Sequence, residues 1–383
     1  MEGIYLDHAA TTPLRPDVLE SMMPYLTEHF GNPSSLHGFG RKAKQALTDA
    51  RDFIASVLGC SSGQLFFTSG GTESDNMAII GVAEALKAQG KTQIITTTAE
   101  HHAVLHACRS LAKRGFQITY VPVDKTGQVN PEDIAKAISD KTALVSVMYA
   151  NNEVGTIQPI AEIGAICQNS NVFFHVDAVQ ALGAIPIRLS DLPVDLMSFS
   201  AHKIGGPKGV GLLYCERHVP LDPILHGGSQ ERKKRPGTEN VAAIVGFAKA
   251  IDIAQDYAPN KQSSMSRLHD LFLETLRSEI DQSGFSVNGH PKQRIESIVN
   301  ISFPGINKET LLMNLDLAGI AASGGSACTS GSLEDSHVLM AMGVPKTIIA
   351  SSIRFSFGDR TTDQDIIQAA QKTGTIINRL RKK

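Results

Sequence analysis

Short apolar runs alternate with amphipathic helical patterns through the first two thirds of the chain. Seven runs have the length and residue types of buried strands, at 65–68, 93–97, 117–121, 143–148, 172–176, 194–199 and 209–214. Helical patterns lie between most of them, at 72–87, 102–113, 131–138 and 160–168. This alternation predicts the α/β class, with a doubly wound domain on a mainly parallel seven-stranded sheet.

The pattern changes after residue 240. A long helical pattern begins at Asn240, and Tyr257-Ala258-Pro259-Asn260 predicts a break in it. From about Gln262 the chain has an α+β pattern, with strands near 296–303 and 352–356. We therefore predict a large domain that ends at residue 256 and a smaller α+β domain over residues 257–383.

Composition is that of a soluble enzyme. The 383 residues carry a net charge of −2, which gives no reason to expect nucleic acid or a membrane as a partner. The longest nearly apolar run, 241–254, contains two charged residues and is too short to span a bilayer. An odd number of cysteines without a CxxC pair, and an N-terminus unlike a signal peptide, favour the cytoplasm.

One lysine stands out at the end of an apolar run. Ser198-Phe199-Ser200-Ala201-His202-Lys203 completes the run, and a glycine-rich loop follows at 204–211. A desolvated lysine loses its proton readily, and a neutral amine forms a Schiff base with an aldehyde such as pyridoxal phosphate, PLP. A surface lysine at a strand–loop junction is the alternative that this segment alone leaves open.

An upstream carboxylate fits the same cofactor. Phe173-Phe174-His175-Val176-Asp177 reads as a buried parallel strand that ends in an acid, and the carboxyl end of such a strand opens into the ligand crevice. An aspartate there would keep a PLP ring nitrogen protonated, and Gln180 could donate to the phenolic oxygen. Asp177 could instead cap the following segment.

A glycine-containing turn is the candidate phosphate site. The strand at 65–68 runs into Ser69-Gly70-Gly71-Thr72-Glu73-Ser74-Asp75-Asn76, and a helical pattern follows. Glycines between a strand and a helix let backbone N–H groups approach an anion at the positive helix end. Thr72 to Asp75 also matches a plain capping box. Neither a Walker A loop nor a dinucleotide fingerprint is present.

Taken together and in order, these motifs resemble those of the cysteine desulfurases, which are PLP enzymes of the class V aminotransferase-like group. The similarity rests on SGGTESDN, EHHAV, NNEVG, HVDAVQ, SFSAHK, RPGTEN, SGGSACTSGS and IRFSFG, with LDHAATTP and GNPSS near the start. It covers essentially the whole chain. It also implies that the first residues pack with the second domain, so that the large domain spans 15–256 and the small one 1–14 and 257–383.

The resemblance implies a role for each motif residue. Lys203 would bind PLP and act as acid and base, Asp177 and Gln180 would contact the ring, and His101 would lie over its face. Thr238 would reach the phosphate of a neighbouring subunit, which implies a homodimer. The cofactor phosphate would be held by Gly71, Thr72, Ser200 and His202. The substrate carboxylate would be held by Asn152 and Arg354, and Asn152 would also contact the cofactor.

Cys328 differs from the other four cysteines. It lies in a small, polar stretch, Ser323 to Ser332, whereas Cys60, Cys108, Cys167 and Cys215 mostly adjoin apolar segments. By resemblance, the Cys328 thiolate attacks the sulfur of L-cysteine, leaving alanine and a persulfide for a sulfur-acceptor protein, an iron–sulfur scaffold or a tRNA-thiolation enzyme. The long loop resembles that of the group I enzymes.

Two further features bear on these expectations. His102 and His106 have a spacing that can bind metal, but no carboxylate or cysteine partner is evident, so we predict no metal. The Gly205-Gly206 pair departs from the family pattern, and we expect it to loosen the loop after Lys203.

The sequence alone leaves alternative functions open. A selenocysteine lyase or an aminotransferase of the same fold would share most of the motifs, and an aminotransferase would not need Cys328. A catalytically idle scaffold that binds sulfur-transfer partners is the alternative from another class.

Overall fold

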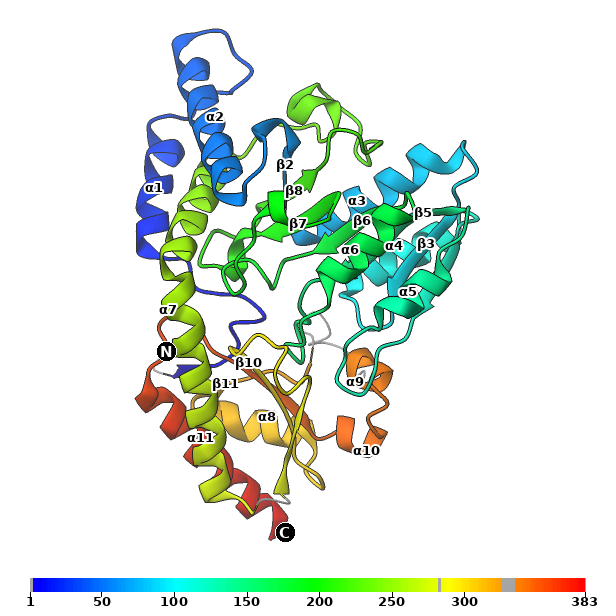
Figure 1. Cartoon of the computed structure of the whole chain (residues 1–383). Helices are drawn as coiled ribbons and strands as arrows, with labels where there is room; N and C mark the ends of the chain where they lie inside the picture. Colours follow the sequence, from blue (N-terminus) through cyan, green and yellow to red (C-terminus); the bar gives the residue numbers. More distant parts are fainter. Residues whose placement is uncertain (1–2, 282–283, 326–334, 383) are drawn as a thin grey trace.

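The larger part of the molecule is built on a seven-stranded sheet (Figure 1). The computed structural model describes residues 3–281, 284–325 and 335–382. Within these residues the strand order is β2-β8-β7-β6-β5-β3-β4, and β8 alone runs against the others. The strands are β2 (Leu65–Thr68), β3 (Gln93–Thr97), β4 (Gln117–Val121), β5 (Thr142–Met148), β6 (Phe173–Asp177), β7 (Leu196–Ser200) and β8 (Gly211–Cys215).

Helices cover both faces of this sheet, which is why its central strands are apolar nearly throughout. One face packs against α3 (Gly71–Lys87) and α4 (His102–Ala112). The other face packs against α2 (Gly38–Leu58), α5 (Pro131–Ala137), α6 (Ile160–Asn169) and the first half of α7 (Val241–Glu279). Every residue of β5 is buried. The predicted α/β class with a mainly parallel sheet is confirmed.

The antiparallel pairing of β7 and β8 positions Lys203. The chain leaves β7 through a short 3-10 turn, Ala201–Lys203, and returns directly into β8, with Ala201 N donating to the Val210 carbonyl at 3.2 Å. No crossover helix intervenes between the two strands. Lys203 is therefore fixed at the strand end, beside the carboxyl ends of β5 and β6.

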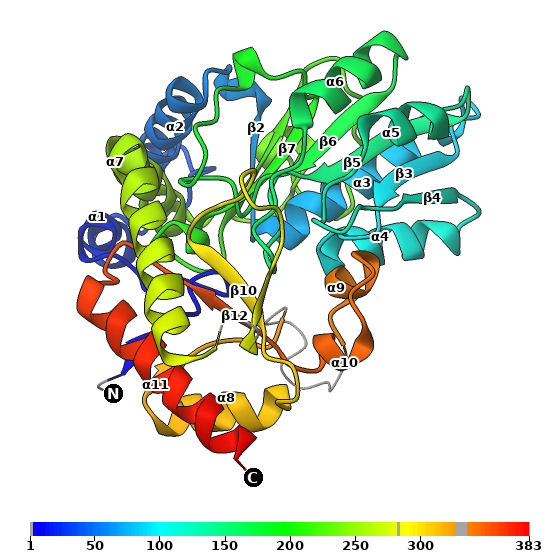
Figure 2. The same ribbon diagram turned by 60° about the horizontal axis from the view of Figure 1, so that its bottom comes forward.

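The smaller part is an α+β arrangement (Figure 2). A three-stranded antiparallel sheet, ordered β12-β10-β9, packs with its own apolar core against α8 (Lys308–Leu317), α11 (Asp363–Arg381) and the end of α7. Its strands are β9 (Ser286–Asn288), β10 (Ile298–Ser302) and β12 (Ser352–Ser356). The N-terminus joins this part: β1 (Ile4–Tyr5) pairs in parallel with β11 (Ile320–Ala321), and Leu6 is buried in the same core.

Helix α7 connects the two parts without interruption. It spans 39 residues, which makes it about 58 Å long at the α-helical rise. The predicted break at 257–260 is therefore wrong: tertiary packing along the helix overrides the local effect of Pro259. A division of the chain at residues 14 and 256 stays a prediction.

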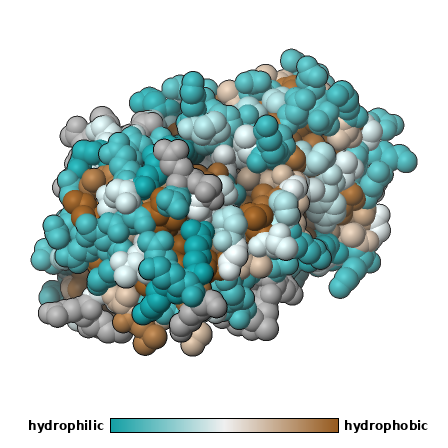
Figure 3. Space-filling model, turned by 90° about the horizontal axis from the view of Figure 1, so that it is seen from below, coloured by the Kyte–Doolittle hydropathy of each residue, from teal (hydrophilic) through white to brown (hydrophobic). Residues whose placement is uncertain are grey.

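The remaining helices lie around this frame: α1 (Pro16–Thr27) packs along α7, and the short α9 (His337–Ala341) and α10 (Lys346–Ile349) follow residue 335. Seen from below, most of the surface is hydrophilic, and apolar residues show between polar ones in patches (Figure 3). Among the described residues, no helix has both the length and the hydropathy that crossing a bilayer requires.

Candidate active site

One pocket gathers most of the residues that the sequence singled out. It opens where β5, β6 and β7 end, beside the start of α3. Its lining includes Gly71, Thr72, His101, Asn152, Asp177, Gln180, Ser200, His202, Lys203 and Arg354.

The pocket wall also contains residues that the sequence analysis missed. Ala9 and Ala10 come from the N-terminal segment, and Asp75 comes from one turn into α3. Gly71 and Asp75 are four residues apart, a spacing that places both on one face of a helix. This spacing could have predicted that Asp75 faces the pocket, but we interpreted Asp75 as part of a capping box. That interpretation is wrong, because α3 begins at Gly71 and its N-cap is Gly70, without a side-chain cap.

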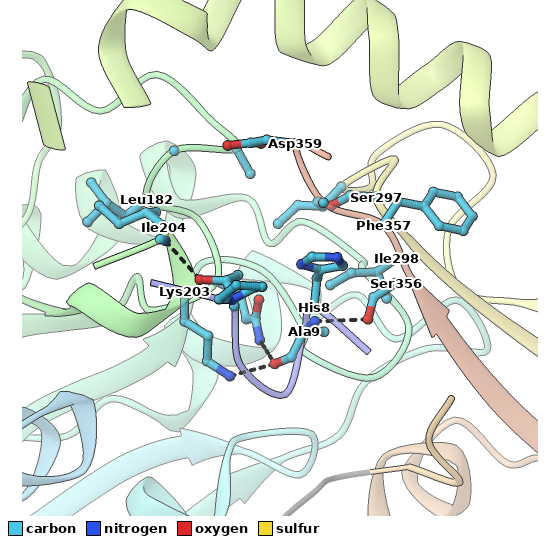
Figure 4. Close-up of a pocket in the computed structure, with 18 of the residues that line it drawn as sticks. His8, Ala9, Leu182, Lys203, Ile204, Ser297, Ile298, Ser356, Phe357 and Asp359 are labelled. Carbon is cyan, nitrogen blue, oxygen red and sulfur yellow. Dashed lines mark hydrogen bonds between the residues drawn. The ribbon is translucent and has the colours of Figure 1, made fainter. Parts of the chain in front are cut away.

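Lys203 points along the wall toward the N-terminal segment. Its Nζ donates to the carbonyl oxygen of Ala9 (Figure 4). It also donates to the Ala10 carbonyl at 2.9 Å. Gln180 Nε2 donates to the same Ala9 oxygen at 2.9 Å. The pocket in Figure 4 is a neighbour of the first, and the two share Ala9, Gln180 and Lys203. The N-terminal segment thus separates two cavities that meet at the lysine.

The loop after Lys203 is held rather than loosened, contrary to our expectation. Gly205 has a φ of 79°, a backbone conformation that favours glycine, and its N–H donates to Thr12 Oγ1 at 2.8 Å. The same hydroxyl donates to the His202 carbonyl at 2.7 Å. A Cβ on Gly205 would lie 2.6 Å from Arg15 Cγ, so the Arg15 stem covers this position closely.

Asp177 ends β6 and faces the pocket. Its Oδ1 accepts from Val179 N at 3.0 Å, so the carboxylate also caps the turn that follows it. Burial raises the pKa of Asp177 to about 6, while the charge of Lys203 opposes that rise. A cation bound in this pocket would therefore favour the charged carboxylate.

A buried polar network lies behind Asp177. His175, two residues earlier on β6, contacts Ser146 Oγ at 2.8 Å and Ser198 Oγ at 2.9 Å. Asp75 Oδ1 lies 3.6 Å from His175 Nε2. Burial, reinforced by the charge of Asp177, raises the pKa of Asp75 well above its usual value, and burial lowers the pKa of His175 to about 3. The His175 imidazole is thus neutral near pH 7.

The turn between β2 and α3 forms the opposite end of the pocket. Gly70 adopts a φ of 155°, and a Cβ on Gly71 would lie 2.5 Å from Val179 Cγ2. The backbone of Gly211 at the start of β8 packs directly against this turn, because a Cβ on Gly211 would lie 2.5 Å from the carbonyl carbon of Gly70. The N–H groups of the first helical turn have no partner within the helix, so they suit an anion.

His101 and His202 are neutral imidazoles in this pocket. His101 is the N-cap of α4, and its Nδ1 accepts from Ala103 N at 3.2 Å. Burial and the nearby charge of Lys203 lower the pKa of both residues to about 4. His102 lies between His106 and His337, at ring-centroid distances of 5.2 and 4.6 Å. No group of three or more His, Cys, Asp or Glu in the described part of the chain is arranged to hold a metal ion.

Arg354 enters the pocket from β12 of the small sheet. It is 1% exposed, its Nη2 donates to Asp7 Oδ1 at 2.8 Å and its Nη1 donates to the Asn152 carbonyl at 2.8 Å. Its buried Nε has no acceptor among the described residues. A buried guanidinium with an unmatched donor suits a carboxylate ligand.

Two further predicted residues are Thr238 and Cys328. Thr238 is exposed in the segment before α7 and does not line this pocket. Cys328 lies outside the described residues. The other four cysteines are free thiols, and burial raises the pKa of each to about 12: Cys60, Cys108, Cys167 and Cys215.

Glu100, which precedes His101, provides a test of how burial changes the pKa of a carboxyl group beside the pocket. Its carboxyl accepts from Thr97 Oγ1 at 2.7 Å and from Met148 N at 2.9 Å, yet burial raises its pKa from 4.5 to about 8. The stability that the neutral acid contributes is complete below pH 4.5 and is lost as the pH rises through about 8. Glu100→Gln keeps a neutral, equally sized side chain at every pH.

We therefore expect Glu100→Gln to match the wild type in thermal unfolding near pH 4.5 and to exceed it increasingly toward pH 8, by roughly 4 kcal/mol. Glu84→Gln, on the more exposed side of α3, is the control and should follow the wild type throughout. A difference that is constant with pH would show that Glu100 is already charged when buried.

Comparison with known proteins agrees with this geometry. The model of the class V aminotransferase family matches residues 4–368. The cysteine desulfurase IscS of Methanosarcina thermophila is 49% identical over 380 residues, covering 99% of this chain and 93% of that protein. A putative cysteine desulfurase, IscS 1 of Bacillus subtilis, is 48% identical over 381 residues, covering 99% of this chain and all of that protein.

Solved structures give the same result. A NifS-like protein superposes with a TM-score of 0.92 at 40% identity, covering 98% of this chain and 99% of its own. A structure described as SspA in complex with cysteine superposes with a TM-score of 0.82 at 34% identity, covering 92% of this chain and 98% of its own. The chain therefore belongs to the cysteine desulfurase family, within the class V aminotransferases, whose cofactor is pyridoxal phosphate.

Proposed function

We propose that this protein is a cysteine desulfurase that converts L-cysteine to L-alanine and transfers the sulfur, as a persulfide, to an acceptor protein. The observation that carries the proposal is the convergence of Lys203, Asp177 and Arg354 on one pocket. These three groups come from two different sheets, and each supplies an interaction that an amino acid bound to PLP requires.

The residues present fit this cofactor. The glycine turn at Gly70 and Gly71 leaves helix N–H groups open to a phosphate, and Thr72, Ser200 and His202 border the same end. Asp177 fits the ring nitrogen, because a protonated pyridinium would be a positively charged partner for its buried carboxylate. Gln180 fits the phenolic oxygen, and His101 and Asn152 fit the ring and its substituents.

Bound PLP supplies an electron sink that stabilises charge at the substrate Cα. Lys203 is the group placed to take a proton from Cα and to return it, because its amine lies in the wall of the pocket. The His101 imidazole is neutral near pH 7, so its unprotonated ring nitrogen can accept a proton in the same pocket. Arg354 would orient the substrate through its carboxylate, with its own position fixed by Asp7 and Asn152.

Cys328 would carry the sulfur. Its thiolate attacks the substrate Sγ, the Cβ–Sγ bond breaks, the S–S bond of a persulfide forms, and the electrons left on Cβ take up a proton to give alanine. The four other cysteines are poorly suited to this role, because burial keeps each thiol protonated near pH 7. The sulfur acceptor would be an iron–sulfur scaffold or a tRNA-thiolation enzyme.

We also propose that the active form is a cytoplasmic homodimer in which Thr238 completes the phosphate site of the neighbouring subunit. Exposed apolar side chains near the N-terminus support an interface: Phe30 is 71% exposed, Leu36 90% and Phe39 61%. The rings of Phe30 and Phe39 stack with centroids 5.8 Å apart, so these two side chains form one exposed apolar patch.

The products of L-cysteine turnover test the proposed activity. The protein should release alanine in amounts equal to the sulfide recovered when a thiol reductant is present. Formation of a keto acid and an aminated cofactor would instead indicate an aminotransferase. A strong preference for L-selenocysteine, with little activity toward L-cysteine, would indicate a selenocysteine lyase.

A further inference from the structure

The segment between β8 and α7 contains an unusual backbone conformation. Glu231, Arg232 and Lys233 have φ values of 43°, 55° and 66°, so three consecutive residues with side chains adopt the left-handed region. Residues other than glycine disfavour this region, and left-handed residues normally occur singly. Contacts with the rest of the molecule must therefore hold this left-handed turn in place.

A buried ion pair holds the turn against β2. The Glu231 side chain is almost fully buried and accepts from both terminal nitrogens of Arg51, with the Nη1 contact at 2.9 Å. The same carboxylate accepts from Phe67 N at 2.9 Å. Arg51 and Arg232 both donate to the Leu65 carbonyl. The turn is thus attached to the strand that leads into the candidate phosphate turn, and Figure 1 shows this segment beside β2.

The next charged side chain connects the segment to the phosphate turn itself. Arg235 Nε donates to Glu73 Oε1 at 2.8 Å, and its Nη2 donates to Glu73 Oε2 at 3.3 Å. Glu73 lies in the first turn of α3, next to Thr72, and its Oε2 accepts from Ser69 N at 2.7 Å. Burial alone would raise the pKa of Glu73, but the hydrogen bonds from Arg235 and Ser69 lower it, so the carboxylate is charged.

We propose that Arg235 is a positioning residue for the cofactor phosphate. Held by the left-handed turn, it orients Glu73, and Glu73 fixes the Ser69 end of the turn whose glycines face the phosphate. Thr238 follows Arg235 by three residues. The contacts of the left-handed turn and of Arg235 therefore also orient the segment that would reach the neighbouring subunit. This inference rests on the proposed function, because it assumes that this end of the pocket binds the PLP phosphate.

Phosphate-dependent affinity is the measurement that isolates this role. We would titrate the cofactor-free, full-length protein with PLP and, separately, with pyridoxal, which lacks the phosphate. Arg235→Gln should weaken PLP binding by about tenfold and pyridoxal binding by less than about twofold. Arg114→Gln is the matched control, since it removes another arginine–glutamate pair of α3, the 3.3 Å contact with Glu84 at the far end of that helix.

A second variant separates positioning from a loss of fold or of the dimer. Glu73→Gln keeps an oxygen for Ser69 but removes the charge that Arg235 contacts, and it should reproduce the selective loss of PLP affinity in a protein that remains folded and dimeric. Equal weakening of PLP and pyridoxal, or unchanged PLP affinity in both variants, would overturn the inference. Failure of the wild type to bind PLP would overturn the proposed function instead.

Discussion

Replacing Cys328 by serine is expected to abolish sulfur release from L-cysteine while cofactor binding is retained. Serine keeps the size and polarity of the side chain but lacks the soft nucleophile that attacks sulfur. The groups that we propose bind PLP and the substrate carboxylate, Lys203 and Arg354 among them, are untouched. Sulfide and alanine formation should fall by at least about a hundredfold, measured as initial rates with a thiol reductant.

The other cysteines provide the controls for this prediction. Cys60 is the least buried of the four, and burial still raises its thiol pKa to about 12. Cys60→Ser should therefore turn over L-cysteine at nearly the wild-type rate. A Cys328→Ser protein that kept the wild-type rate would contradict the persulfide mechanism and favour an aminotransferase or lyase reaction.

Lys203→Ala should lose both the covalent link to PLP and turnover. The structure directs the Lys203 amine along the pocket wall, at the junction of the N-terminal segment and the end of β7. Without it, no side chain at this position can form the Schiff base or move the Cα proton, so the rate should fall by about a thousandfold or more. Borohydride reduction followed by mass spectrometry of the peptides measures the link directly.

Lys208→Ala is the matched control, because Lys208 lies in the same loop and is exposed. It should retain the reducible link and the wild-type rate. Recovery of PLP on another lysine in the Lys203→Ala protein, with turnover preserved, would show that the assignment of Lys203 is wrong.

Local sequence predicted most of the large sheet and the end of each strand that faces the pocket. The reason is physical: a parallel strand covered on both faces must be apolar, so the polar residues that end it, such as Asp177, are conspicuous. Strand β6 was predicted for this reason, and a strand near β12 was predicted from its own apolar run.

Long-range packing produced the features that the sequence did not reveal. Helix α7 continues through Pro259 because both halves of the molecule pack along it. Asp75 was taken for a helix cap, although its burial behind Asp177 depends on β6 and β7, far away in the sequence. The left-handed conformation of Glu231 to Lys233 has no glycine to signal it, since the contacts with Arg51 and β2 impose it.

The location of sulfur after one turnover tests the central claim most directly. The purified protein would be mixed with sulfur-labelled L-cysteine without reductant, and its peptides would be analysed by mass spectrometry under conditions that preserve persulfides. The proposed function predicts one labelled sulfur on the peptide that contains Cys328 and one alanine released per labelled chain. Alanine release without labelled sulfur on Cys328, or label on one of the four buried cysteines instead, would contradict it.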